Sequence, residues 1–149
     1  MQEQLKLNIQ LLKNAVNKPS YGSTHASGFD LNAGIDTNIV IPPKEIKIIP
    51  TGIIIEIPSG YEGQLRSRSG LASKNAISVL NSPGTIDSDY RGEIKVILIN
   101  LSAIKFFVLP GMRIAQLIIA PTFKVKFNYV KKISTFTKRG KKGFGSTGL

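Results

Sequence analysis

Apolar and polar residues alternate, or apolar residues cluster, in many short stretches of this chain. Leu5, Leu7, Ile9 and Leu11 alternate with polar residues, which is typical of a half-buried strand. Further strand-like runs cover residues 38–41, 45–49, 52–57, 63–66, 77–80, 94–101, 105–109, 113–120 and 122–130. Proline and glycine separate most of these runs. Short strands with frequent turn signals predict an all-β sandwich, jelly roll or barrel.

The chain has 149 residues, which is the size of one domain. Residues 70–75 are the one stretch that fits a short helix. From Thr135 the strand periodicity ends, and four glycines follow Arg139. We therefore expect a β domain over residues 1–134 and a mobile tail over residues 135–149.

Composition excludes several classes of protein. Hydrophobic residues make up 42% and charged residues 19%, which argues against a disordered chain. The apolar runs are too short to span a bilayer, so no membrane association is expected. Cysteine is absent, which removes disulfides, thiol nucleophiles and cysteine metal sites. The N-terminus lacks the pattern of a secretory signal, and we expect a cytoplasmic protein.

The formal net charge of +11 favours an anionic partner, either nucleic acid or phosphate, although a lysine-rich solvated surface would give the same charge. Lysine is the usual cation here. Arginine occurs only at positions 66, 68, 91, 113 and 139. Because the guanidinium group binds phosphate through two parallel hydrogen bonds, this sparse use favours discrete phosphate sites over a diffuse nucleic-acid surface.

The segment 81–93 concentrates turn formers, two aspartates, a tyrosine and an arginine between two strand-like runs. Its Pro83-Gly84 pair is a strong turn signal. The pattern predicts a tight β-hairpin with a polar tip. Such a tip fits either a backbone surface for a small planar ligand, with Asp87 or Asp89 as a reactive carboxylate, or an ordinary solvated turn.

Elimination narrows the chemistry further. The single histidine, His25, lies in a loop-like stretch, and neither a nucleophile elbow nor a Walker motif is present. Carboxylates are then the remaining general bases, and Asp30, Asp87 and Asp89 stand in glycine-bearing motifs. Arginines and backbone amides could stabilise charge on a phosphate, with a divalent cation held by the phosphates.

The tail carries Phe144 between two glycines, followed by Ser146 and Thr147. Glycine backbone and hydroxyl groups suit a phosphate, and an aromatic ring can stack on a base. A disordered basic end would also fit this composition.

Five segments in order resemble the signature segments of the trimeric deoxyuridine triphosphatases, and together they cover nearly the whole chain. They are residues 26–33 (ASGFDLNA), 68–72 (RSGLA), 81–93 (NSPGTIDSDYRGE), 111–116 (GMRIAQ) and 139–148 (RGKKGFGSTG). The resemblance implies a jelly-roll (β-clip) subunit and a homotrimer. Its active sites would take the second and fourth segments from one chain, the third from another and the tail from the third. The implied activity is hydrolysis of dUTP to dUMP and pyrophosphate, which limits uracil incorporation into DNA and supplies dUMP for thymidylate synthesis.

The resemblance also implies roles for single residues. Asp87 would deprotonate the attacking water, and Tyr90 would pack under the deoxyribose and exclude a 2′-hydroxyl. The uracil edge would meet Asn81 and the backbone of Gly84, Thr85 and Ile86. The phosphates would meet Arg68, Ser69, Gly70 and Gln116.

The tail would close over the nucleotide, with Phe144 on the uracil and Arg139, Ser146 and Thr147 around the γ-phosphate. Gly145 is also expected to bind the substrate. Asp30 and Arg113 would order the site without touching substrate, with Arg113 bracing Asp30 or the interface. Mg²⁺ would arrive coordinated by the triphosphate and water, without protein ligands. One departure is Ser67, where many relatives carry proline, and this change is expected to loosen a loop slightly.

Three other functions remain open from the sequence. A dCTP deaminase shares the fold but needs a further glutamate and a longer chain. A fold relative that binds nucleotide or protein without catalysis would not need Asp87 and the tail. A nucleic-acid-binding protein would show affinity that falls steeply with salt.

Overall fold

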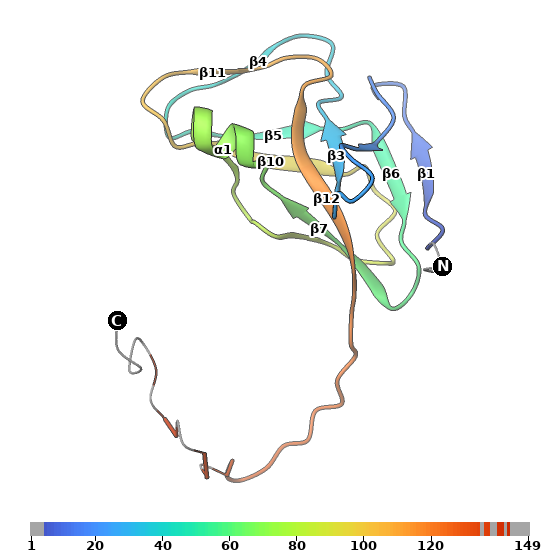
Figure 1. Ribbon diagram of the computed structural model, residues 1–149, viewed down its shortest axis with the longest axis vertical. Helices are drawn as coiled ribbons and strands as arrows, with labels where there is room; N and C mark the ends of the chain where they lie inside the picture. Colours follow the sequence, from blue (N-terminus) through green and yellow to red (C-terminus); the bar gives the residue numbers. More distant parts are fainter. Residues whose placement is uncertain (1–4, 135, 138–139, 142, 144–149) are drawn as a thin grey trace.

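The computed structural model describes residues 5–134, 136–137, 140–141 and 143. Within this part the regular secondary structure consists of β-strands and the single helix α1 at Ser69–Asn75 (Figure 1). The strands are β1 Asn8–Leu11, β2 Ser20–Tyr21, β3 Phe29–Asn32, β4 Ile39–Ile41, β5 Ile46–Pro50, β6 Ile53–Glu56, β7 Tyr61–Arg66, β8 Ile77–Val79, β9 Gly84–Ile86, β10 Lys95–Asn100, β11 Phe106–Val108 and β12 Arg113–Pro121. The prediction of an all-β fold is confirmed.

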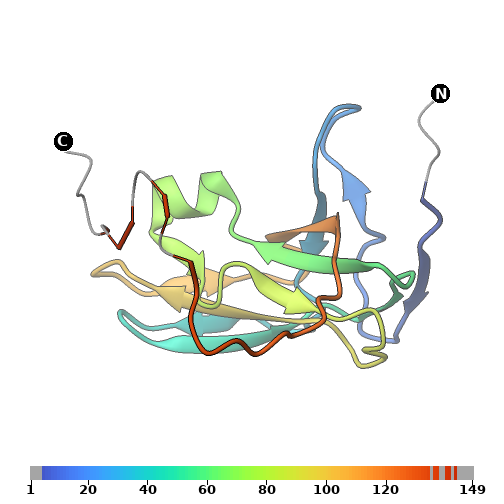
Figure 2. The same ribbon diagram turned by 90° about the horizontal axis from the view of Figure 1, so that it is seen from below.

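Two sheets form the body of the subunit. One has the strand order β2-β3-β12-β7-β9 and the other the order β5-β10-β8, and all of their neighbouring strands are antiparallel. Figure 2 shows the sheets as stacked layers. The pairs β1-β6 and β11-β4 complete a β jelly roll. No helix among the described residues has the length and apolar character needed to cross a membrane.

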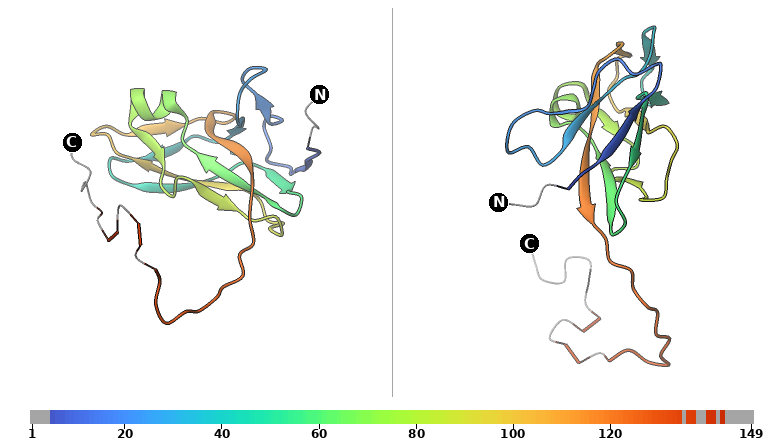
Figure 3. Two further views of the ribbon diagram at one scale, coloured as in Figure 1. Left: turned by 60° about the horizontal axis from the view of Figure 1, so that its bottom comes forward. Right: turned by 90° about the vertical axis from the view of Figure 1, so that its right-hand side faces the viewer.

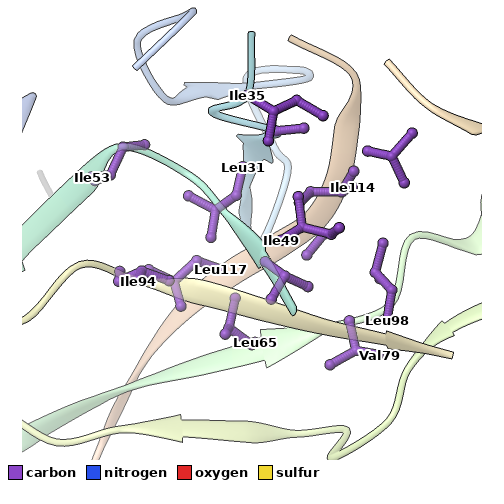
Figure 4. Packing of buried hydrophobic residues seen from close by; sticks show 14 of the residues in the cluster. Leu31, Ile35, Ile49, Ile53, Leu65, Val79, Ile94, Leu98, Ile114 and Leu117 are labelled. Carbon is purple, nitrogen blue, oxygen red and sulfur yellow. The ribbon is translucent and has the colours of Figure 1, made fainter. Parts of the chain in front are cut away.

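The core lies between the two sheets and is built from alternate residues of their strands. In β10, Val96, Leu98 and Asn100 are buried, whereas the residues between them are half-buried on the other face. Leu31 and Leu117 of the larger sheet lie opposite this layer, and both are fully buried (Figure 4). Because successive side chains of a strand point to opposite faces, this alternation fixes which face each strand presents to solvent.

The segment 81–93 does not form the tight hairpin tip expected from the sequence. The flanking strands β8 and β10 do pair with each other. Between them, however, β9 crosses to the other sheet and pairs with β7. The segment therefore bridges the two layers, and residues 87–93 lead back from β9 to β10.

The predicted strand at residues 122–130 is wrong. After β12 ends at Pro121, the chain continues through residues 122–134 without secondary structure, and we call this stretch the C-terminal arm (Figures 1 and 3). Its alternating apolar side chains are exposed: Phe123 by 89%, Phe127 by 74% and Tyr129 by 92%. The alternation is that of a strand, but a strand needs a neighbour for its backbone hydrogen bonds, and the described chain offers none here.

Candidate functional site

The segment from the end of β7 into the start of α1, residues 67–70, carries three of the predicted phosphate-binding residues, and we call it the phosphate turn. Strand β7 ends at Arg66, and Arg68 precedes the helix with extended backbone angles, φ −85° and ψ 128°. Ser69 and Gly70 begin the helix and are exposed. Ser67 and Arg68 are half-buried, so the turn presents Ser69 and Gly70 to solvent at the end of the larger sheet.

Asp30 of β3 joins two arginines at this end of the sheet. Its Oδ1 lies 3.0 Å from Nε of Arg68, and its Oδ2 lies 3.2 Å from Nη1 of Arg113. Nη1 of Arg68 also donates to the backbone oxygen of Arg113 at 3.2 Å. The side chain of Asp30 is only 15% exposed, so one shielded carboxylate fixes two cations. The cluster keeps a net positive charge and holds the guanidinium of Arg68 in one orientation, as an anion site requires.

Gln116 of β12 connects this cluster to the phosphate turn. It lies opposite Asp30 on one side and opposite Arg66 on the other. Its Nε2 donates to the backbone oxygen of Ser67 at 3.0 Å. In this structure Gln116 supports the turn from beneath, and its direct contact with phosphate stays a prediction.

Ser67 ties the phosphate turn to β8 through its hydroxyl group. Its Oγ accepts a hydrogen bond from the backbone N of Val79 at 2.8 Å. The same atom lies 2.9 Å from Oγ of Ser78. Both partners belong to β8, which leads directly to Asn81. The sequence showed only that serine occupies a place where many relatives carry proline. It did not indicate the hydrogen bonds between this serine and β8.

The predicted base-binding residues lie just beyond β8. Asn81 is exposed in the turn before β9, and the Ser82–Pro83 peptide bond is cis. Gly84 is buried between Leu65 and Asn81: a Cβ on Gly84 would lie 3.2 Å from Cβ of Leu65 and 3.1 Å from Nδ2 of Asn81. The amide of Asn81 and the backbone of β9 are therefore adjacent, as a surface for a planar base requires.

Asp87 follows β9 directly and is exposed. Its backbone oxygen accepts from the N of Tyr90 at 3.1 Å, which closes a turn over residues 87–90. Arg91 supports this turn, because its Nη1 donates to the backbone oxygens of Ser88 at 2.7 Å and Tyr90 at 3.0 Å. Asp87 also lines a hollow of about 500 Å³. Its carboxylate is thus open to water while its backbone is fixed.

The phosphate turn and Asp87 lie at different places along β7. Gln116 pairs with Arg66, whereas Ile86, the residue before Asp87, pairs with Gly63. Three residues at about 3.3 Å each separate these positions by about 10 Å along the strand. The direction of β9 carries Asp87 farther from the turn. One chain therefore presents two separate groups of the predicted residues.

Glu93, at the end of the same segment, has a structural role that the sequence did not reveal. Its Oε1 accepts from Nδ2 of Asn14 at 2.9 Å and from the N of Gly52 at 2.8 Å. The predicted tail residues Arg139, Phe144, Gly145, Ser146 and Thr147 lie outside the described residues.

The comparisons with known proteins agree with one another. The dUTPase family model matches residues 14–148. A deoxyuridine 5'-triphosphate nucleotidohydrolase of Chlamydia trachomatis serovar L2 is 53% identical over 137 residues, which cover 92% of this chain and 94% of the relative.

Two solved structures of phage dUTPases have the same fold. A mutant dUTPase of Staphylococcus bacteriophage 80alpha, solved with dUpNHpp, has a TM-score of 0.88 at 28% identity and covers 98% of this chain and 100% of its own. A mutant dUTPase from phage phi11 of S. aureus, described with a structural Mg(II) ion, has a TM-score of 0.77 at 26% identity and covers 86% of this chain and 98% of its own.

Replacement of Ser67 by alanine should destabilise the protein, because the backbone N of Val79 then loses its acceptor. We expect a loss of about 1–2 kcal/mol, seen as a thermal midpoint lowered by several degrees. Ser59→Ala, at an exposed position, is the matched control. Equal midpoints for the two variants would contradict the role assigned to the Ser67 hydroxyl.

Proposed function

The chain belongs to the dUTPase family, and we propose that it carries out the family reaction with Asp87 as the base that activates water. It hydrolyses dUTP to dUMP and pyrophosphate. This reaction removes dUTP from the precursors of DNA and supplies dUMP for thymidylate synthesis. The observation that carries the proposal is the placement of Asp87, exposed at the end of β9 beside the base-binding backbone.

In the proposed mechanism, Asp87 takes a proton from a water molecule as the water oxygen attacks the α-phosphorus. The bond from the α-phosphorus to the bridging oxygen breaks, and pyrophosphate leaves with the electron pair of that bond. The turn closed by Tyr90 N and Asp87 O holds the base in place. A fixed carboxylate within reach of the attacking water is what general base catalysis requires.

Base and sugar selection are assigned to the rest of the segment 81–93. Uracil meets the amide of Asn81 and the backbone of Gly84, Thr85 and Ile86. The ring of Tyr90 packs against the deoxyribose, where a 2′-hydroxyl would collide with it. The adjacency of Asn81 and Gly84 supports this assignment.

Phosphate binding is assigned to Arg68, Ser69, Gly70 and Gln116, with Asp30 and Arg113 holding Arg68 in place. The tail residues Arg139, Phe144, Gly145, Ser146 and Thr147 are proposed to close over the bound nucleotide. The described residues contain no group of three carboxylate or imidazole side chains suited to a metal. Mg²⁺ is proposed to bind through the triphosphate and water, where it would offset the phosphate charge.

The active enzyme is proposed to be a homotrimer whose sites are shared between chains. The distance between the phosphate turn and Asp87 supports this, because one nucleotide can then be held by residues of different subunits. The C-terminal arm supports it as well, since its exposed apolar face matches a strand that pairs outside its own chain. Because its substrate is a DNA precursor, we assign the enzyme to the cytoplasm.

The substrate is tested by pyrophosphate release with Mg²⁺ from dUTP, dCTP, dTTP and UTP. We expect kcat/KM for dUTP to exceed the other values by about 100-fold or more, because base and sugar are each checked by fixed groups. Comparable turnover of UTP would contradict the role of Tyr90. Ammonia release from dCTP would instead indicate a deaminase.

Asp87→Asn should lower kcat by about 100-fold or more, because the asparagine amide cannot accept the proton of the attacking water. The affinity for dUTP should change little, because asparagine has nearly the same size and shape as aspartate. Asp89→Asn, two residues away and also exposed, is the control and should retain kcat. Full activity of Asp87→Asn would refute the assignment of the base.

Shared sites can be tested with two inactive variants, Asp87→Asn and Arg68→Ala. If each site takes Arg68 from one chain and Asp87 from another, each mixed trimer contains one intact site. Co-refolding at equal amounts should then restore about one quarter of the wild-type activity, because three quarters of the trimers are mixed. No recovery in mixed trimers whose composition is confirmed by native mass spectrometry would place both residues in one chain.

A further inference from the structure

Gly92 lies against the ring of Tyr90 and leaves no room for a side chain. A Cβ placed on Gly92 would lie 2.6 Å from Cζ and 3.0 Å from Cε2 of that ring, and closer still to the hydroxyl. Contacts this short do not occur between real carbon atoms, so a methyl group here would force the ring to move. Tyr90 is 44% exposed, and its ring can therefore shift without disturbing the core.

The backbone of Gly92 does not itself require glycine. The described glycines with positive φ are Gly52, Gly60, Gly111 and Gly140, and Gly92 is not among them. Its φ therefore lies outside the left-handed region that favours glycine. The absence of a side chain at this position therefore serves the ring of Tyr90 and not the turn.

Glu93 holds the hydroxyl end of the Tyr90 ring. The hydroxyl of Tyr90 donates to the backbone oxygen of Glu93 at 3.0 Å. Glu93 is itself tied down, because its carboxylate accepts from Asn14 and from Gly52 N. The next residue continues this attachment, since Ile94 N donates to Ile53 O at 2.8 Å. The acceptor that holds the tip of the ring thus belongs to the rigid body of the subunit.

We propose that Gly92 and the backbone oxygen of Glu93 position the Tyr90 ring, and that this position sets the preference for deoxyribose over ribose. The inference rests on the proposed role of Tyr90 at the sugar. Exclusion by contact works only if the excluding group cannot yield, because a ring that moves aside admits the larger sugar. A bare Gly92 and a fixed acceptor hold the ring where it excludes a 2′-hydroxyl.

The test is Gly92→Ala, measured as the ratio of kcat/KM for dUTP to kcat/KM for UTP. The new methyl group displaces the hydroxyl from the Glu93 oxygen, and we expect the ratio to fall about tenfold or more. Gly22→Ala is the matched control, because a Cβ on Gly22 has nothing within 4 Å and its φ is not positive. The control should keep the wild-type ratio.

The outcomes separate this inference from the proposed function. If the wild-type enzyme does not prefer dUTP over UTP, the role of Tyr90 itself fails. If the wild type prefers dUTP and Gly92→Ala keeps the same ratio, the positioning role is overturned, even if KM rises equally for both nucleotides. In a Tyr90→Ala background, Gly92→Ala should change the ratio no further, since the ring it displaces is gone.

Tyr90→Phe tests the contribution of Glu93, because it removes the hydrogen bond without adding bulk. We expect the ratio to fall about threefold, less than in Gly92→Ala, because the ring still rests against Gly92. An unchanged ratio would remove the Glu93 oxygen from the proposal. Should Gly92→Ala fail to fold by circular dichroism, the ratio for Tyr90→Phe still decides the part of the proposal that concerns the Glu93 oxygen.

Discussion

The register of β12 between β3 and β7 is the constraint on which the proposed phosphate site depends. This pairing places Gln116 opposite Asp30 on one side and opposite Arg66 on the other. Asp30 can then reach two arginines, and Gln116 can reach the carbonyl of Ser67. A shift of one residue would turn these polar side chains into the core and bring Leu117 out of it, so the buried leucine and the charged cluster enforce the same register.

Each of the two sheets carries one group of the predicted site residues. The larger sheet holds the phosphate turn through β7 and β12, whereas the segment 81–93 follows β8 of the smaller sheet and crosses over through β9. Ser67 joins the two parts, because its hydroxyl ties the turn to the strand that leads to Asn81. Packing of the two layers therefore sets how the segment 81–93 sits relative to the phosphate turn of the same chain, and in the proposed trimer these two groups serve different sites.

Much of this arrangement was predictable from the sequence, where local pattern and structure agree. The run at 94–101 is almost continuously apolar, and residues 70–75 fit a short helix, so both elements were found. Strand β9 was missed because Gly84 and its neighbours read as a turn, and only the distant partner β7 makes them a strand. The arm was misjudged for the opposite reason: its alternation is strong, but the described chain gives it no partner. Contacts such as those of Ser67 and Glu93 join residues far apart in sequence, and no local pattern encodes them.

The order of residues along the C-terminal arm affects how separate chains of this protein associate through their arms. Phe123, Val125 and Phe127 alternate with Lys124 and Lys126, so in an extended arm one face is apolar and the other is cationic. If two arms paired directly as neighbouring strands, their lysine ammonium groups would lie within about 5–8 Å of one another. Repulsion between these like charges opposes that pairing. We therefore expect the lysines to oppose aggregation of chains through their arms.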